Sequence, residues 1–133
     1  MSEAPKYGYI GLGNMGAPMA KRLVDWPGGL IVFDLRDEAM APFVEAGATA
    51  AAGLADVAAA DIISVTVLND DQVREVVGEL AKEANPGTVI AIHSTISPDT
   101  AVELAEQLQP NGIHVVDAPV TGGGSAAKKG ELA

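Results

Sequence analysis

The fold of this chain is decided by the stretch Tyr9-Ile-Gly-Leu-Gly-Asn-Met-Gly16. The strand-like run Lys6–Ile10 leads into it, and a segment with helical apolar spacing follows it. The residues expected to share one face of that helix are Met15, Met19, Leu23 and Trp26. A strand, a glycine turn and a helix in this order are the context in which a Gly-x-Gly-x-x-Gly pattern binds the diphosphate of a dinucleotide.

Each glycine of this pattern has its own physical role. Gly11 permits the tight turn, Gly13 lets the backbone approach a diphosphate, and Gly16 lets the helix pack closely on the strand. Free backbone N–H groups at the helix start and the helix dipole then bind the anion without a lysine. Taken alone, the stretch also fits glycines chosen only for turn geometry. The predicted cofactor-binding residues here are Gly11, Leu12, Gly13, Asn14, Met15 and Gly16.

A second anchor follows the next expected strand. Dinucleotide sites place an acidic residue roughly 20 residues beyond the glycine turn, where it accepts hydrogen bonds from the adenine ribose, and Asp34 stands at that distance. The same carboxylate would repel a 2′-phosphate, so NAD is favoured over NADP. Arg36 leaves NADP possible, because an arginine just past this strand can bind the 2′-phosphate. A helix cap is the structural alternative for Asp34, although Asp37 can fill that role instead.

The rest of the chain alternates β-branched runs with segments of helical period. The expected strands are Lys6–Ile10, Leu30–Phe33, Ile62–Val67, Thr88–Ile92 and Ile113–Val116. The expected buried faces of the later helices are Met40, Phe43 and Val44, then Val73, Val76, Val77 and Leu80, then Val102, Leu104, Ala105 and Leu108. Repeated β-α-β units predict parallel strands with right-handed crossovers. We therefore expect a doubly wound, mostly parallel α/β sheet, a Rossmann-type domain occupying residues 1–133.

Local signals mark where several of these helices begin. Asn69 followed by Gln72 resembles a capping box, and Ser97 before Pro98 is a typical helix cap with proline in the first turn. The alanine-rich stretch Gly53–Ala60 predicts a short helix before the third expected strand.

The composition excludes several classes of function. Hydrophobic residues make up 48% of the chain but aromatic residues only 4%, as in parallel sheets buried on both faces by helices. The net charge of −10 and the lack of a basic stripe argue against nucleic-acid and anionic membrane partners. The chain contains no cysteine for disulfides or thiolate metal sites. With no signal peptide or long apolar run, a cytoplasmic location is the expectation.

Three later loops leave the carboxyl edge of the expected sheet, where a ligand of such a fold binds. They are 67–70, 93–96 and 117–124. We expect the first two to flank the nicotinamide half of the cofactor, which makes Leu68 and Asn69 candidate binding residues, and the third to face the substrate.

Three stretches of the chain together resemble the β-hydroxyacid dehydrogenases. This family includes 3-hydroxyisobutyrate dehydrogenase and tartronate semialdehyde reductase, and it is related to the NAD-binding domain of 6-phosphogluconate dehydrogenase. Gly11–Ala20 resembles its cofactor signature, Ser94–Pro98 its fifth-strand loop, and Asp117–Gly130 its substrate signature. The three stretches span nearly the whole chain in the family's order.

The resemblance implies an oxidoreductase that moves a hydride between a small 3-hydroxy acid and NAD(P). It places Thr95 beside the nicotinamide and assigns the substrate carboxylate to Thr121, Gly122 and Gly123. The family's general acid/base is a lysine on a following helix, which we expect beyond Ala133, as we do the family's helical second domain. We therefore assign no catalytic residue to this chain, and we expect it to be a truncated domain that is inactive alone.

Some positions depart from the family's habit. Val67 stands where methionine is usual, and Asn69-Asp70 where proline often follows the leucine. Thr121 replaces the more frequent serine but keeps the hydroxyl. His93 occupies a commonly acidic position, and the sequence offers no account of it.

Other readings of these residues are weaker. His93 and Ser94 are neighbours that point to opposite faces of a strand, so they do not form a hydrolase triad with Asp99. His93 and His114 lack a second ligand at helical spacing, so no metal site is predicted. The loop 122–129 lacks the Gly-Lys-Ser/Thr ending of a phosphate loop.

One functional alternative remains, a non-catalytic module that senses a dinucleotide. The substrate-like loop 117–123 favours the enzyme, because a sensor has no need of it. We also expect a homo-oligomer, because a sheet that ends near Val116 exposes an unpaired strand edge.

Overall fold

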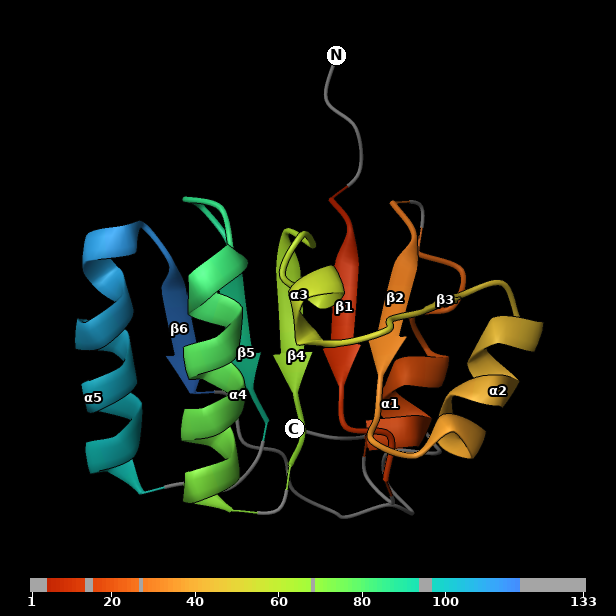
Figure 1. The fold of residues 1–133 in the computed structure, drawn as a ribbon, viewed down its shortest axis with the longest axis horizontal. Coiled ribbons are helices and arrows are strands. Elements are labelled where there is room, and N and C mark those ends of the chain that lie inside the picture. The colour runs from red at the N-terminus through yellow and green to blue at the C-terminus, as the bar shows by residue number, and fades with distance from the viewer. Residues whose placement is uncertain (1–4, 14–15, 27, 68, 94–96, 118–133) are drawn as a thin grey trace.

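The computed structural model describes residues 5–13, 16–26, 28–67, 69–93 and 97–117. Within them a six-stranded sheet has the order β3-β2-β1-β4-β5-β6, and every pair of neighbouring strands is parallel (Figure 1). The strands are β1 (Tyr7–Ile10), β2 (Leu30–Phe33), β3 (Thr49–Ala50), β4 (Ile62–Val65), β5 (Val89–Ile92) and β6 (His114–Asp117). The strand order reverses between β1 and β4. This topology confirms the expected Rossmann-type fold.

Helices cover both faces of the sheet. They are α1 (Gly16–Lys21), α2 (Asp37–Glu45), α3 (Leu54–Val57), α4 (Asp70–Glu83) and α5 (Pro98–Leu108), which a short 3-10 turn (Gln109–Asn111) follows. The helices α3, α4 and α5 pack on one face, and α1 and α2 contribute to a separate apolar cluster on the other (Figure 1). The strands β1, β2, β4, β5 and β6 point to the same edge of the sheet, the lower edge in Figure 1.

Neighbouring residues of a strand contribute their side chains to different apolar clusters, one on each face of the sheet. Tyr9 and Val32 belong to the cluster of α1 and α2, whereas Ile10 and Ile63 belong to the cluster of α3, α4 and α5. Successive strand residues point to opposite faces, so a sheet with helices on both sides buries nearly every strand side chain. This explains why the core consists mainly of aliphatic side chains and why the expected strands are rich in β-branched residues.

The capping predictions are confirmed. The side chain of Asn69 accepts a hydrogen bond from the backbone N–H of Gln72 at 2.9 Å, and the hydroxyl of Ser97 accepts one from Thr100 at 3.2 Å. The short helix expected within residues 53–60 is also present, as α3. None of the helices in the described ranges is long and apolar enough to cross a membrane.

The elements differ from the sequence predictions at four points. The strand β3 was missed, because its two residues are exposed and carry no apolar period. The first helix ends at Lys21, and turns occupy residues 22–25, so it is shorter than expected. Val102, expected on a buried face, is 56% exposed. Two residues turn a helix by about 200°, which places Val102 nearly opposite the buried Leu104.

Val44 was also placed wrongly on a buried face. It follows the buried Phe43 in α2 and is exposed, because one residue turns the helix by about 100° and carries Val44 out of the apolar stripe. Val116 on β6, at the end of the described sheet, is exposed as well. Self-association through that edge stays a prediction.

The strand β1 packs closely against α3 at Gly8. A Cβ atom at Gly8 would lie 2.6 Å from Cγ1 of Val57 and 3.3 Å from Cβ of Ala60, and neither neighbour can rotate away easily. We expect Gly8→Ala to lower the free energy of unfolding by about 1–3 kcal/mol, as measured by urea denaturation. The control is Gly78→Ala in α4, where no described atom lies within 4 Å of the new methyl group and the gain in helix propensity stabilises by about 1 kcal/mol. Equal stability of the two variants would contradict this packing.

Candidate functional site

The glycine turn lies at the carboxyl end of β1, beside the point where the strand order reverses. Gly11 has a φ of 96°, and a Cβ atom there would lie 1.8 Å from the carbonyl oxygen of Thr66. A Cβ atom at Gly16 would lie 1.8 Å from the carbonyl oxygen of Gly11. Both contacts are with backbone, which cannot give way, so both positions accept only glycine. The first and third glycines are therefore required by the packing of β1, β4 and α1.

Gly13 differs from the other two glycines. It is exposed, and no described atom lies within 4 Å of the position that its Cβ would occupy. Its carbonyl oxygen accepts the backbone N–H of Ala17 at 2.9 Å, which ties the turn to the first turn of α1. The described protein gives no packing reason for glycine at this position. A ligand that approaches the backbone closely supplies such a reason, and a diphosphate fits it.

The carboxylate of Asp34 is bonded directly to the glycine turn. Its Oδ2 atom accepts the backbone N–H of Leu12 at 2.8 Å, and its Oδ1 atom accepts the backbone N–H and the Nε–H of Arg36 at 2.9 and 3.2 Å. The side chain of Asp34 is only 12% exposed, whereas that of Arg36 is 57% exposed. The structure thus brings together the turn at the end of β1 and the carboxylate just past β2.

The surroundings of Asp34 keep it ionised. Burial by itself raises the pKa of this carboxyl, but the hydrogen bonds from Arg36 and Leu12 and the positive charge of Arg36 outweigh it, so the pKa lies below its ordinary value. An ionised carboxylate accepts about four hydrogen bonds. The described residues donate three, so among them one acceptor position remains for a hydroxyl, and a second becomes free when the exposed Arg36 side chain moves.

Asp34 does not cap α2, which was its structural alternative. Arg36 is the residue before the first turn of α2 and makes no side-chain capping bond, and Asp37 is the first residue of the helix. The carboxylate of Asp34 is directed instead to Leu12, across from β2 to β1.

A polar pair lies behind the turn, and sequence reasoning missed it. The hydroxyl of the buried Tyr9 lies 2.9 Å from Oγ1 of Thr66 and 3.4 Å from the sulfur of Met19. Burial raises the pKa of Tyr9 to about 12, although the hydrogen bond with Thr66 lowers it in part, so this hydroxyl stays protonated. The pair joins β1 to Thr66, the residue that follows β4 and whose backbone lies against Gly11.

A second polar group accounts for His93. Its Nε2 atom lies 3.0 Å from the hydroxyl of Ser64, which lies 2.7 Å from the hydroxyl of Tyr7. The ring of His93 also stacks on that of Tyr9, with 6.4 Å between the centroids. Polar residues at alternate strand positions were a visible signal for a shared face. Only the register of β1, β4 and β5 shows which of them meet.

The remaining predicted residues fall into two groups. Asn69 precedes α4 on the β4 side of the site. It is exposed, and its side chain makes the capping bond described above. Seven predicted residues lie outside the described residues, namely Asn14, Met15, Leu68, Thr95, Thr121, Gly122 and Gly123. Within the described ranges, no group of three or more acidic or histidine side chains is placed to hold a metal ion.

Comparison with known proteins gives this arrangement a family. A family model described as the NAD binding domain of 6-phosphogluconate dehydrogenase matches residues 6–133. An uncharacterised oxidoreductase of Mycobacterium tuberculosis is 69% identical over 134 residues, which cover 98% of this chain and 45% of that protein. The mitochondrial 3-hydroxyisobutyrate dehydrogenase of Rattus norvegicus is 37% identical over 136 residues, which cover 99% of this chain and 41% of that protein.

A solved structure with a similar sequence has the same fold. The crystal structure of an oxidoreductase from Mycobacterium avium matches with a TM-score of 0.93 and 69% identity, and the match covers 97% of this chain and 47% of that one. Fold and site together define an α/β domain of the dinucleotide-binding class. The chain belongs to the family of the NAD-binding domain of 6-phosphogluconate dehydrogenase, as the resemblance predicted. It spans less than half the length of the relatives that it matches.

The lowered pKa of Asp34 makes a prediction about stability and pH. Because the folded protein holds the ionised form more strongly, Asp34 contributes stability above its unfolded pKa, and this contribution is lost as pH falls through the lower folded pKa. We expect Asp34→Asn to lower the free energy of unfolding by about 1–3 kcal/mol above pH ~5. The difference in unfolding free energy between the variant and the wild type, measured by urea denaturation, should shrink below pH ~4. Asp25→Asn, at an exposed position, is the control. A difference that does not change with pH would contradict the assignment.

Proposed function

We propose that this chain binds NAD across the carboxyl edge of its sheet. The observation that carries the proposal is the 2.8 Å hydrogen bond from the Leu12 backbone N–H to the Asp34 carboxylate. It places an ionised acceptor beside a turn that leaves Gly13 open to a ligand. The diphosphate would lie against Gly13 and the start of α1, and the adenine ribose would donate hydrogen bonds to Asp34.

We further propose that NAD is preferred to NADP. A ribose hydroxyl can donate to the position that remains on Asp34, whereas a 2′-phosphate brings negative charge next to an ionised carboxylate. Arg36 would favour NADP if its guanidinium were directed away from this carboxylate. Its Nε atom lies 3.2 Å from Oδ1 of Asp34, so part of its charge is already neutralised there.

The whole protein is proposed to be an oxidoreductase that acts on a small 3-hydroxy acid. When bound, the nicotinamide supplies the carbon that accepts or donates the hydride. Residues 1–133 are proposed to form one domain that binds and orients the cofactor, with Leu68, Asn69 and Thr95 on the nicotinamide side and 121–123 holding the substrate carboxylate. The resemblance assigns the proton transfer to a lysine in a following helical domain, so we assign no proton transfer to this chain.

Two glycines of the turn have different proposed roles: Gly13 allows binding of the cofactor, and Gly16 allows packing of α1. We expect Gly13→Ala to fold with a free energy of unfolding within about 1 kcal/mol of the wild type, because its methyl group has open space. Its affinity for NAD should fall more than tenfold in calorimetry, because the methyl group blocks the diphosphate. Gly16→Ala should lose about 3 kcal/mol of stability, because its methyl group meets the Gly11 carbonyl. Undiminished NAD binding by Gly13→Ala would contradict the proposed site.

The cofactor preference has its own test. We expect NAD to bind the wild type at least tenfold more tightly than NADP, because the carboxylate at Asp34 repels the 2′-phosphate. Asp34→Asn should weaken the binding of NAD and strengthen that of NADP. The ratio of the two affinities, measured in parallel calorimetric titrations, should therefore narrow or reverse. Arg36→Ala serves as the counterpart and should weaken NADP more than NAD. Tighter binding of NADP by the wild type would overturn the proposed role of Asp34.

A further inference from the structure

We propose that Asp70 is a positioning residue for the nicotinamide half of the cofactor. It ties the beginning of α4 to the beginning of α5, and the connections that precede these two helices are the ones that the sequence assigns to the nicotinamide. The inference rests on the proposed NAD site and adds a residue that lies outside the glycine turn and Asp34.

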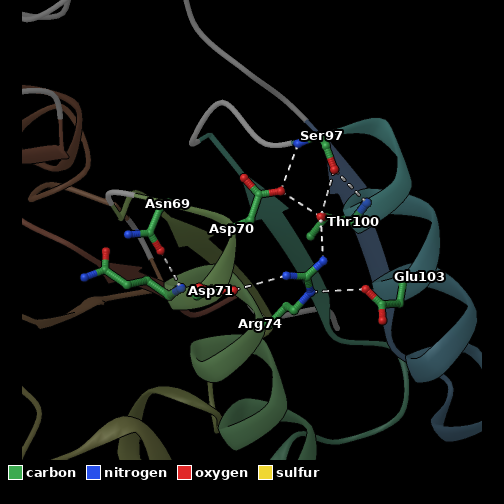
Figure 2. A network of polar contacts seen from close by, with 8 residues as sticks. Asn69, Asp70, Asp71, Arg74, Ser97, Thr100 and Glu103 are labelled. Atoms are coloured by element: carbon green, nitrogen blue, oxygen red, sulfur yellow. Dashed lines mark hydrogen bonds and ion pairs between the residues drawn. The ribbon is translucent and has the colours of Figure 1, made fainter.

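The clamp consists of two hydrogen bonds to one carboxylate oxygen. Oδ2 of Asp70 accepts the backbone N–H of Ser97 at 3.0 Å and the hydroxyl of Thr100 at 2.7 Å (Figure 2). Asp70 is the first residue of α4, whereas Ser97 and Thr100 are the cap and the third residue of α5. One side chain therefore joins two helix starts that are separated by β5.

The protons in this group can be assigned. The single hydroxyl proton of Thr100 goes to Asp70, so in the 2.9 Å pair between Thr100 and Ser97 the hydroxyl of Ser97 is the donor. The Ser97 hydroxyl also accepts the backbone N–H of Thr100 at 3.2 Å, and Nη2 of Arg74 donates to the Thr100 hydroxyl at 3.1 Å. Each of the two hydroxyl protons therefore has one acceptor, Oδ2 of Asp70 for Thr100 and Oγ1 of Thr100 for Ser97. Such a group fixes the cap of α5 in one orientation relative to α4.

The charge on Asp70 strengthens the clamp. The hydrogen bonds from Thr100 and Ser97 and the nearby charge of Arg74 lower the pKa of its carboxyl, although partial desolvation acts the other way. The group is therefore ionised at neutral pH, and hydrogen bonds to an ionised acceptor are roughly twice as strong as neutral ones.

Asp71, the next residue, provides a contrast. Its carboxylate pairs with Nη1 of Arg74 at 3.3 Å within the same helix, and its side chain is 93% exposed. Arg74 also reaches Glu103 of α5 at 3.2 Å, in a second exposed ion pair. Exposed pairs contribute little to stability. Asp71 thus has the same charge as Asp70 and lies in the same helix, but within the described ranges its carboxylate makes no hydrogen bond to the start of α5.

The clamp is separate from what holds α4 and α5 on the sheet. Val73, Val77 and Leu80 of α4 and Leu104 and Leu108 of α5 are all buried in one apolar cluster. Removing the Asp70 carboxylate leaves this packing intact and removes only its two bonds to the start of α5, while Arg74 still donates to the Thr100 hydroxyl. The effect should therefore appear in the nicotinamide half of the ligand rather than in the fold or in the adenine half.

The experiment compares two ligands of the wild type and three variants by calorimetry. NAD contains the nicotinamide, and ADP-ribose offers the same adenosine diphosphate without it. For Asp70→Ala we expect NAD affinity to fall about tenfold and ADP-ribose affinity to stay unchanged. Asp71→Ala should leave both affinities unchanged. Asp70→Asn should recover part of the loss, because one amide oxygen can accept both hydrogen bonds without the charge.

The outcomes separate this inference from the function on which it rests. A wild type that binds neither ligand overturns the proposed NAD site. A wild type that binds both, with an Asp70→Ala variant that loses affinity for both equally or for neither, overturns the positioning role alone. Circular dichroism and the stoichiometry of ADP-ribose binding report the folded fraction of each variant. A folding defect therefore shows as a lost binding fraction and not as a lost affinity.

Discussion

The candidate site depends on the hydrogen bond between the Leu12 N–H and the Asp34 carboxylate. It exists because β1 and β2 are parallel and in register, with Ile10 beside Phe33, so that the chain leaves both strands at the same edge. The N–H of Gly11 donates to the carbonyl of Phe33 at 3.0 Å and continues the ladder into the turn. One carboxylate thus orders the turn and stays ionised, with an acceptor position left for a ligand.

The two halves of the sheet are stabilised differently near this edge. On the β1–β2 side, Asp34 joins the ends of two neighbouring strands. On the β4–β5 side, Asp70 joins the starts of two neighbouring helices. Between them, the pair of Tyr9 and Thr66 lies under the turn at the reversal of strand order. Polar contacts therefore join strand ends and helix starts near this edge, while aliphatic packing holds the layers together.

Most of the fold could be predicted because its elements carry strong local signals. The run Leu30–Phe33 is wholly apolar, and Ile62–Val65 is apolar except for Ser64, as expected for strands buried on both faces. The strand β3 could not be predicted, because its pairing with β2 and not its own exposed residues makes it a strand. The exposure of Val102 was missed for a related reason, since apolar character does not tell which side of a helix meets the sheet.

The sequence by itself determined the glycine turn and its acidic partner, because both follow from the order of residues along the chain: glycines between a strand and the helix that follows it, and a carboxylate just past the next strand. The tertiary structure alone decided the contacts of Asp70 with Thr100 and of Ser64 with Tyr7 and His93. These partners are 29 to 57 residues apart in the chain. Nothing local marks them as partners, because such side chains meet only after the strands have chosen their neighbours and register.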